Sequence, residues 1–174
     1  WDDLVELFGP TGQQGGCWCM WNRQSSREFE QCKGDTNRAS LRQLVDAGAV
    51  PGLLAYADGE PVGWVSVGPR SDFGRLQRSR VTKPVDDVPV WAITCFVIHR
   101  RFRRRGVATA LLQAAVDHAR ASGAPAVEGY PVEPRRDAMP DIYAWMGVAS
   151  SFVNAGFVEI ARRSEHRPVM RLDL

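Results

Sequence analysis

The residues best suited to chemistry lie in one short stretch in the middle of the chain. Its basic residues are Arg100, Arg101, Arg103, Arg104 and Arg105. Gly106-Val107-Ala108-Thr109 follows and opens a segment whose apolar residues recur at helical spacing as far as Gly123. A helix start leaves backbone N–H groups unpaired and carries the positive end of the helix dipole. Small residues let an anion approach these groups, and arginines add charge and paired donors. The stretch therefore predicts a phosphate-binding site.

The basic stretch does not fit the common nucleotide-binding motifs. The chain has neither the Gly-x-x-x-x-Gly-Lys-Ser/Thr of a P-loop nor the three glycines of a dinucleotide-binding turn. A net charge of +2 and a single basic run without a recognition-helix pattern do not predict a nucleic-acid partner. Steep, salt-dependent binding to DNA of any sequence is the observation that would favour such a partner.

The elements around the phosphate site alternate between strand and helix patterns. Residues 90–98 form a nearly continuous apolar run, typical of a strand covered on both faces. Asp58-Gly59 between two apolar segments predicts a β-hairpin over residues 53–67. Further strands are expected over 126–130, 157–161 and 168–172, and helices over 2–8, 35–47, 107–122 and 141–155. This order predicts one α/β domain over residues 1–174, with a mixed sheet and helices on both faces.

The chain has four cysteines, Cys17, Cys19, Cys32 and Cys95. No Cys-x-x-Cys and no pair of histidines at ligand spacing accompanies them, so we expect no metal site. Reduced thiols are the expectation, and they fit a cytoplasmic protein. No apolar stretch approaches the length of a membrane span, and the first residues show an amphipathic helical pattern instead of a signal peptide. We therefore expect no membrane association.

Two motifs of the sequence occur together in order. Arg103-Arg104-Arg105-Gly106-Val107-Ala108 has the pattern Arg/Gln-x-x-Gly-x-Gly/Ala, between an apolar strand and a helix. Phe152-Val153-Asn154-Ala155-Gly156-Phe157 has an aromatic residue followed four residues later by Gly-Phe. Both motifs resemble those of the GNAT superfamily of acyl-CoA N-acyltransferases. The resemblance implies a mostly antiparallel sheet with a splayed pair of central strands. It also implies transfer of an acyl group from acetyl-CoA or another acyl-CoA to a primary amine.

The resemblance also implies the residues that hold the co-substrate. The pantetheine arm would pair with the edge of the central strand, and the pyrophosphate would lie on the turn and the start of the helix. The cofactor-binding residues would then be Phe96, Val97, Ile98, Arg103, Arg104, Arg105, Gly106, Val107, Ala108 and Thr109. The expected partners are the acyl-CoA and an amine acceptor, and the expected state is a monomer or a homodimer.

The catalytic base is the next question, because an alkylamine must lose a proton before it attacks a thioester. Val127-Glu128 resembles the Leu-Glu of the branch that acetylates the N-termini of ribosomal proteins, in which the Glu is the base. Glu128 is therefore the candidate, and pairing of Glu128 with a basic side chain is the alternative. Glu133 and Asp141 are further candidates. Ala92 stands where the branch that acts on histone lysines carries its base.

The sequence departs from the family pattern at two places. Phe152 stands where many members have a tyrosine that protonates the leaving thiolate, which leaves Tyr130, Tyr143 or water as donors. This departure keeps a second function open, an acyl-CoA-binding sensor without turnover. The family's first strand is not evident before the first helical pattern, so it is missing from this sequence or replaced by residues 17–21. These residues are expected to form either a short strand or a packed loop, and to line the acceptor site or to pack in the core.

Overall fold

The computed structural model describes residues 1–134 and 143–174, and this part of the chain contains a six-stranded sheet of order β1-β2-β3-β4-β6-β5. The strands β3 and β4 are parallel, and every other neighbouring pair is antiparallel. The expected mixed and mostly antiparallel sheet is therefore confirmed. The strands are β1 Gly52–Ala57, β2 Glu60–Pro69, β3 Trp91–Ile98, β4 Ala126–Gly129, β5 Val158–Arg162 and β6 Pro168–Asp173.

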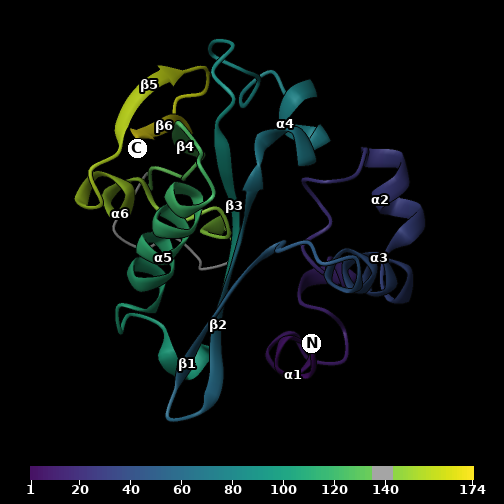
Figure 1. Cartoon of the computed structure of the whole chain (residues 1–174). Coiled ribbons are helices and arrows are strands. Elements are labelled where there is room, and N and C mark those ends of the chain that lie inside the picture. The colour runs from purple at the N-terminus through teal and green to yellow at the C-terminus, as the bar shows by residue number, and fades with distance from the viewer. Residues whose placement is uncertain (135–142) are drawn as a thin grey trace.

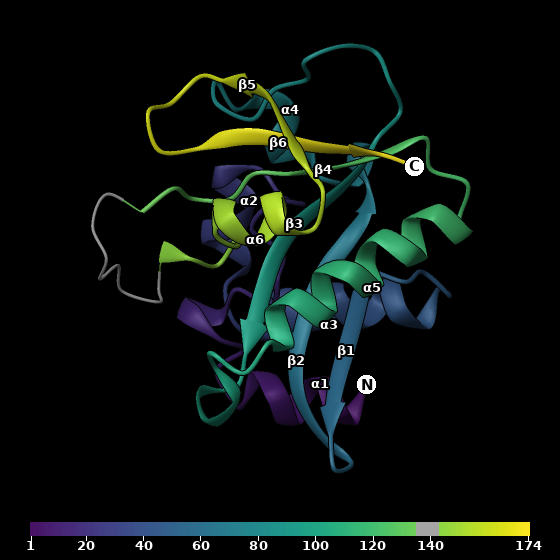
Figure 2. The ribbon, with the colours of Figure 1, turned by 90° about the vertical axis from the view of Figure 1, so that its left-hand side faces the viewer.

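Helices cover both faces of this sheet (Figure 1 and Figure 2). One face carries α5 (Val107–Ala121) and α6 (Ala149–Asn154). The other face carries the N-terminal helices and a short helix that follows β2. These are α1 Asp2–Phe8, α2 Ser26–Cys32, α3 Asp35–Asp46 and α4 Gly74–Arg78. No helix in the described parts of the chain combines the length and apolar character that crossing a bilayer requires.

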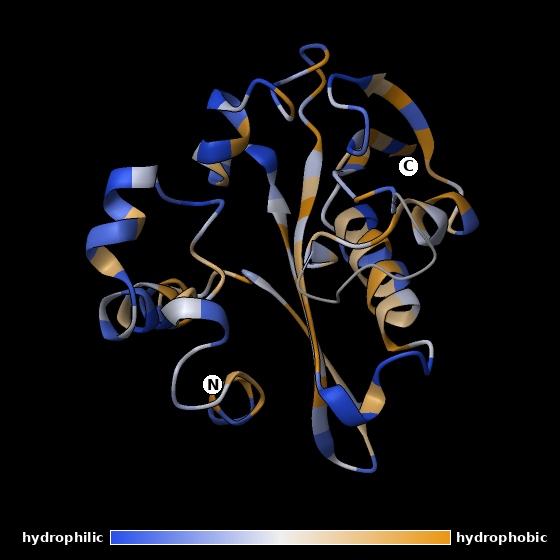
Figure 3. Cartoon of the chain, turned by 180° about the vertical axis from the view of Figure 1, so that it is seen from behind, coloured by the Kyte–Doolittle hydropathy of each residue, from blue (hydrophilic) through white to orange (hydrophobic). Residues whose placement is uncertain are grey.

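The hydrophobic pattern of the sequence explains this layering. On α5, one stripe of apolar side chains is buried, and it packs on Val65, Ile93 and Val127 of the central strands. On the opposite face, Trp64 and Val97 pack against the N-terminal helices. In Figure 3 the long central strands are coloured mostly as hydrophobic, whereas blue is concentrated on the outer helices and loops. The central strands are apolar on both sides because both sides are covered.

The central strands separate halfway along their length. Residues Trp91–Ile93 of β3 pair with Val127–Gly129 of β4, and β3 then continues to Ile98 beyond this pairing. On the other edge of β3, Ser66 pairs with Cys95 and Val67 with Ile93, so Thr94 is an extra residue. Such a bulge bends a strand and increases its twist. The splayed pair that the resemblance implied is therefore present.

Of the two expectations for residues 17–21, a short strand or a packed loop, the structure has the packed loop: a series of turns in which Trp18 and Cys19 have φ values of 45° and 54°. Two other local expectations differ from the structure. The helix expected over 141–155 is shorter, because α6 begins only at Ala149. Asp141 lies outside the described residues. The helix α2 was not anticipated, although Ser25 and Glu28 form the capping box that marks its start.

Candidate functional site

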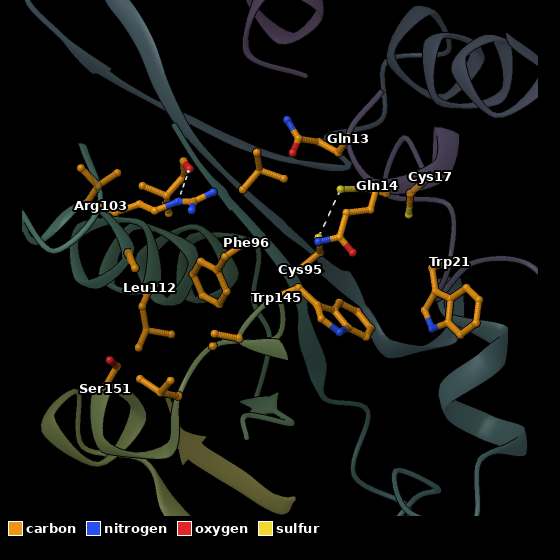
Figure 4. Close-up of a pocket in the computed structure, with 18 of the residues that line it drawn as sticks. Gln13, Gln14, Cys17, Trp21, Cys95, Phe96, Arg103, Leu112, Trp145 and Ser151 are labelled. Carbon is orange, nitrogen blue, oxygen red and sulfur yellow. Dashed lines mark hydrogen bonds between the residues drawn. The ribbon is translucent and has the colours of Figure 1, made fainter. Parts of the chain in front are cut away.

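A cavity of about 1010 Å³ lies between the edge of β3, the start of α5 and the N-terminal segment that contains residues 13–33 (Figure 4). Pockets that bind small molecules usually measure about 300–1,000 Å³, so this one is large enough for a nucleotide-sized molecule and a second reactant. The loop between β4 and α6 closes one side through Ala144, Trp145, Gly147 and Val148. The cavity therefore joins segments that are far apart in the sequence.

Most of the predicted cofactor-binding residues line this cavity. They are Phe96, Val97, Ile98, Arg103, Arg104, Gly106, Val107, Ala108 and Thr109. Arg105 is the exception: its side chain is exposed, and its guanidinium lies 5.8 Å from the centroid of the Phe102 ring. The structure thus brings the strand edge and the helix start together at one cavity, as the two halves of the predicted site require.

The start of α5 is open for an anion. Gly106 precedes the helix with φ 82° and ψ −4°, a left-handed conformation that glycine adopts without strain. No atom lies within 4 Å of the position that a Cβ would take at Gly106. The N–H groups of Val107, Ala108 and Thr109 have no partner within the helix, as in the first turn of any helix. Open space, unpaired donors and the helix dipole thus favour a phosphate here.

The turn before α5 is tied to the end of β3. The Nε of Arg103 donates to the carbonyl oxygen of Ile98 at 3.3 Å. The N–H of His99 donates to Val62 of β2 at 2.9 Å, whereas the N–H of Phe96 donates to the Trp145 carbonyl in the gap at 2.7 Å. Because strand N–H groups alternate in direction, the N–H of Ile98 faces the same gap as that of Phe96. The Ile98 amide is therefore the part of this edge placed to pair with an extended ligand.

Glu128, the predicted catalytic base, does not line this cavity. Its side chain is 1% exposed and lines a second cavity of about 300 Å³, not the larger one. One carboxylate oxygen accepts from Arg171 at 2.7 and 3.2 Å, and the other accepts from the Tyr130 hydroxyl at 2.8 Å. The Nε of Arg70 lies 3.6 Å from the Glu128 carboxylate, and Arg171 also pairs with Asp86. The pairing with basic side chains that the sequence left as the alternative is thus the arrangement found.

The candidate proton donors are not gathered at the cavity either. The Tyr130 hydroxyl is bonded to Glu128 and Arg70, and burial together with the charge of Glu128 raises its pKa. Tyr143 is 60% exposed. Phe152 does line the cavity, where its ring packs edge-on against Phe96 and Phe157. Phe152 therefore has the packing role of an apolar wall.

The remaining acidic candidate is Glu133. Its carboxylate pairs with Arg162 at 2.5 Å on the surface, and it is not among the residues that line the cavity. Among the described lining residues, Glu30 is the single carboxylate, and it pairs with Lys33 at 2.6 Å. Sequence reasoning missed Glu30 because it missed the helix α2 that carries it. The Ser25-x-x-Glu28 capping pattern was the available signal.

The segment Cys17–Trp21 contributes both to the core and to the wall of the cavity. Trp18 and Met20 are buried in the core, whereas Cys17, Cys19 and Trp21 line the cavity. Burial raises the pKa of the Cys17 thiol to about 11, and the hydrogen bond with Cys95 together with burial raises the pKa of Cys19 well above its ordinary value. In the described part of the chain, no group of three or more His, Cys, Asp and Glu is arranged to hold a metal ion.

Comparisons with solved structures agree with this fold. A histone acetyltransferase HPA2 and related acetyltransferase from Corynebacterium glutamicum superimposes with a TM-score of 0.54 at 18% identity, over 98% of this chain and 88% of that one. The PaiA N-acetyltransferase from Thermoplasma acidophilum, in complex with coenzyme A, superimposes with a TM-score of 0.52 at 13% identity, over 99% of this chain and 92% of that one. The ribosomal-protein-alanine N-acetyltransferase from Brucella melitensis superimposes with a TM-score of 0.52 at 16% identity, over 80% of this chain and 78% of that one.

The family is shown by a comparison of the sequence itself. No curated protein sequence matches the chain. The model of the acetyltransferase (GNAT) family matches residues 1–147, which include the splayed strands and the whole of α5. On the strength of that match, the chain belongs to the GNAT acetyltransferase family.

Proposed function

We propose that this protein is an N-acetyltransferase that moves an acetyl group from acetyl-CoA to a primary amine. The observation that carries the proposal is the shared cavity, in which the open start of α5 and the splayed edge of β3 meet. Family membership supports the reaction class. The amine would enter from the N-terminal side, which is the part of the cavity that the predicted co-substrate residues leave free.

Each part of the cavity would then have a distinct task. The amides of Val107, Ala108 and Thr109, with the guanidinium groups of Arg103 and Arg104, would hold the phosphates. The Ile98 amide would fix the pantetheine arm along the strand edge. Acetyl-CoA supplies a thioester, whose carbonyl carbon a neutral amine can attack. Holding two reactants in one cavity is itself a large part of catalysis, because it removes the entropy cost of their encounter.

The proton of the amine requires no buried carboxylate in this proposal. Glu128 is enclosed in its own network, and the carboxylate of Glu30 is paired with Lys33. An apolar surrounding disfavours the charged form of an amine and so lowers its pKa. We therefore propose that the amine loses its proton to water in the cavity. Glu128 would act by positioning β4, and not as the base.

The first test is binding and turnover of acetyl-CoA. A ligand that binds only the folded protein raises the free energy of unfolding by about 2.7 kcal/mol at roughly a hundred times its Kd. For a chain of this size, that corresponds to a rise in Tm of about 5–11 °C. Release of free CoA thiol in the presence of amines measures the transfer itself. A protein whose Tm does not respond to millimolar acetyl-CoA does not have the proposed function.

A second candidate function is a sensor that binds acyl-CoA without turnover. Phe152 in the position of the family's tyrosine, together with a Tyr130 enclosed by Glu128 and Arg70, favours it. The same two measurements separate the candidates. A sensor would show the rise in Tm but release no CoA thiol with any amine, whereas an enzyme would show both.

A further inference from the structure

The half of the cavity opposite the start of α5 is walled by aromatic rings and thiols. Trp21 and Phe29 contribute from the N-terminal segment, and Trp145 contributes from the loop after β4. In Figure 4, Trp21 and Trp145 lie on the side of the pocket away from Arg103. The thiol-bearing residues of this wall are Cys17, Cys19 and Cys95. Gln13, Gln14, Glu30 and Lys33 of the N-terminal segment add polar groups to the lining, so the occupant meets aromatic rings and thiols with polar groups beside them.

The aromatic rings are held in place by the surrounding structure. The Trp21 ring meets the Phe29 ring edge-on at a centroid distance of 4.9 Å. The guanidinium of Arg75 lies 3.8 Å from the Trp21 ring centroid, and its Nε donates to the Trp21 carbonyl at 2.6 Å. The backbone of Trp145 is fixed by its bond to Phe96. A surface that is already ordered loses little entropy when a ligand covers it.

The charges of the cavity do not suit a polycation. Its charged lining residues, within the described part of the chain, are Glu30, Lys33, Arg103 and Arg104. The carboxylate of Glu30 pairs with Lys33 at 2.6 Å, so these two opposite charges offset each other. Three positive groups and one negative group give the described lining a formal net charge of +2, which disfavours a polyamine. A single amine on an apolar body meets no such penalty.

We propose that the acceptor is a primary amine carried on an aromatic or similarly apolar body. This inference rests on the proposed function, because it takes this cavity as the acceptor site. The amine nitrogen forms a bond to the thioester carbonyl carbon, and the carbon–sulfur bond breaks. The proton that the nitrogen loses passes through water to the leaving thiolate, so the products are an amide and CoA thiol. The aromatic wall holds the body of the amine and excludes water from it.

The test compares 2-phenylethylamine with spermidine as acceptors for the full chain. We expect kcat/KM for 2-phenylethylamine to exceed that for spermidine by about tenfold or more, the usual effect of a well-packed aromatic contact. In Trp21→Ala, the value for 2-phenylethylamine should fall by a similar factor while the acetyl-CoA Kd stays the same. Trp1→Ala is the matched control, because Trp1 packs on Trp18 and does not line the cavity. It should keep the wild-type preference.

Two results would overturn this assignment of the acceptor. One is a preference for spermidine, and the other is a Trp21→Ala variant with an unchanged ratio between the two amines. Failure of the proposed function is distinguishable, because it abolishes thiol release with every amine. In that case, calorimetric binding of the two amines to the CoA-loaded protein still decides whether the cavity prefers an apolar amine or a polyamine. Tighter binding of spermidine would exclude the apolar acceptor.

A separate observation concerns two thiols in the same wall. The Sγ atoms of Cys19 and Cys95 are 3.4 Å apart, although the residues are 76 positions apart in the sequence. Cys19 has a left-handed backbone, with φ 54°, within the turns of residues 17–21. Cys95 lies on β3 beside the bulge. A bond between the two sulfurs would therefore fasten the N-terminal wall of the cavity to the central strand.

We infer that Cys19 and Cys95 form a reversible disulfide in the presence of a small disulfide such as oxidised glutathione. One protein thiolate attacks the small disulfide, forms a mixed disulfide and releases one glutathione. The second protein thiolate displaces the other glutathione. Two protein thiols are thus oxidised, and one small disulfide is reduced to two thiols. The hydrogen bond with Cys95 and burial raise the pKa of Cys19. Because the thiolate is the attacking form, the rate increases with pH.

Mass spectrometry of the intact protein tests this pair. Wild type incubated with oxidised glutathione should lose the mass of two hydrogen atoms and regain it with dithiothreitol. Cys19→Ser and Cys95→Ser should not show the loss, whereas Cys17→Ser and Cys32→Ser should still show it. Cys32 is a suitable control because it does not line the cavity. Loss of the two hydrogens in Cys95→Ser, or a stable glutathione adduct on wild type, would contradict the pairing.

Discussion

Gly106→Glu is expected to weaken acetyl-CoA binding by about 100-fold or more while the protein stays folded. The new side chain would stand at the open start of α5, where no atom lies within 4 Å of the Cβ position. At an effective dielectric constant of about 20, two like charges about 5 Å apart repel by roughly 3 kcal/mol. That repulsion corresponds to about a 100-fold loss of affinity. Calorimetric titration with acetyl-CoA measures the loss.

The matched control for this variant is at the other end of the same helix. Gly123 has φ 77° and also has no atom within 4 Å of its Cβ position, so glutamate introduces the same backbone strain there. Gly123→Glu should also lower the Tm but keep the wild-type Kd. Equal affinities of Gly106→Glu and wild type would show that the phosphates do not bind at this helix start.

Glu128→Gln is expected to lower the free energy of unfolding by about 3–5 kcal/mol, the usual effect of removing one partner from a buried ion pair. The substitution leaves Arg70 and Arg171 without the charge that both of them face. For a chain of this size, the Tm should fall by about 6–20 °C. Thermal or denaturant unfolding measures the change. The rate per folded molecule should stay near that of wild type, because Glu128 does not line the larger cavity.

Glu133→Gln is the control for this prediction. Glu133 forms an exposed pair with Arg162, and exposed pairs contribute little to stability. A low rate per folded molecule in Glu128→Gln would instead restore Glu128 as the base. The folded Glu128→Gln protein would then be slower by about 10²–10⁴. That loss would become smaller at high pH, where the amine is already neutral.

Local patterns of the sequence determined much of the fold. Asp58-Gly59 specifies the tight hairpin, and both residues have the positive φ values that such a turn needs, 51° and 83°. The apolar stripe of α5 and the glycines at its two ends specify that helix. In each case, the physical cause acts between residues that are close in the sequence. Sequence reasoning was therefore sufficient for the strand, turn and helix that build the predicted phosphate site.

Contacts between distant residues were decided only by the tertiary structure. Arg70 and Arg171 lie far from Glu128 in the sequence, and only the order of the sheet brings both to it. The alternation of polar and apolar residues shows that successive side chains of a strand point to opposite faces of the sheet. It does not show which cavity lies at each face.

The aromatic wall of the larger cavity is a second case of this kind. It joins the turns of residues 17–21, the helix α2 and Trp145 at the splayed strands. No local pattern specifies these contacts, because they form only when elements that are far apart in the sequence pack together at the central strands. The sequence by itself therefore determined the fold class and where the co-substrate is expected to bind. The tertiary structure decided the surroundings of Glu128 and the aromatic wall of the larger cavity.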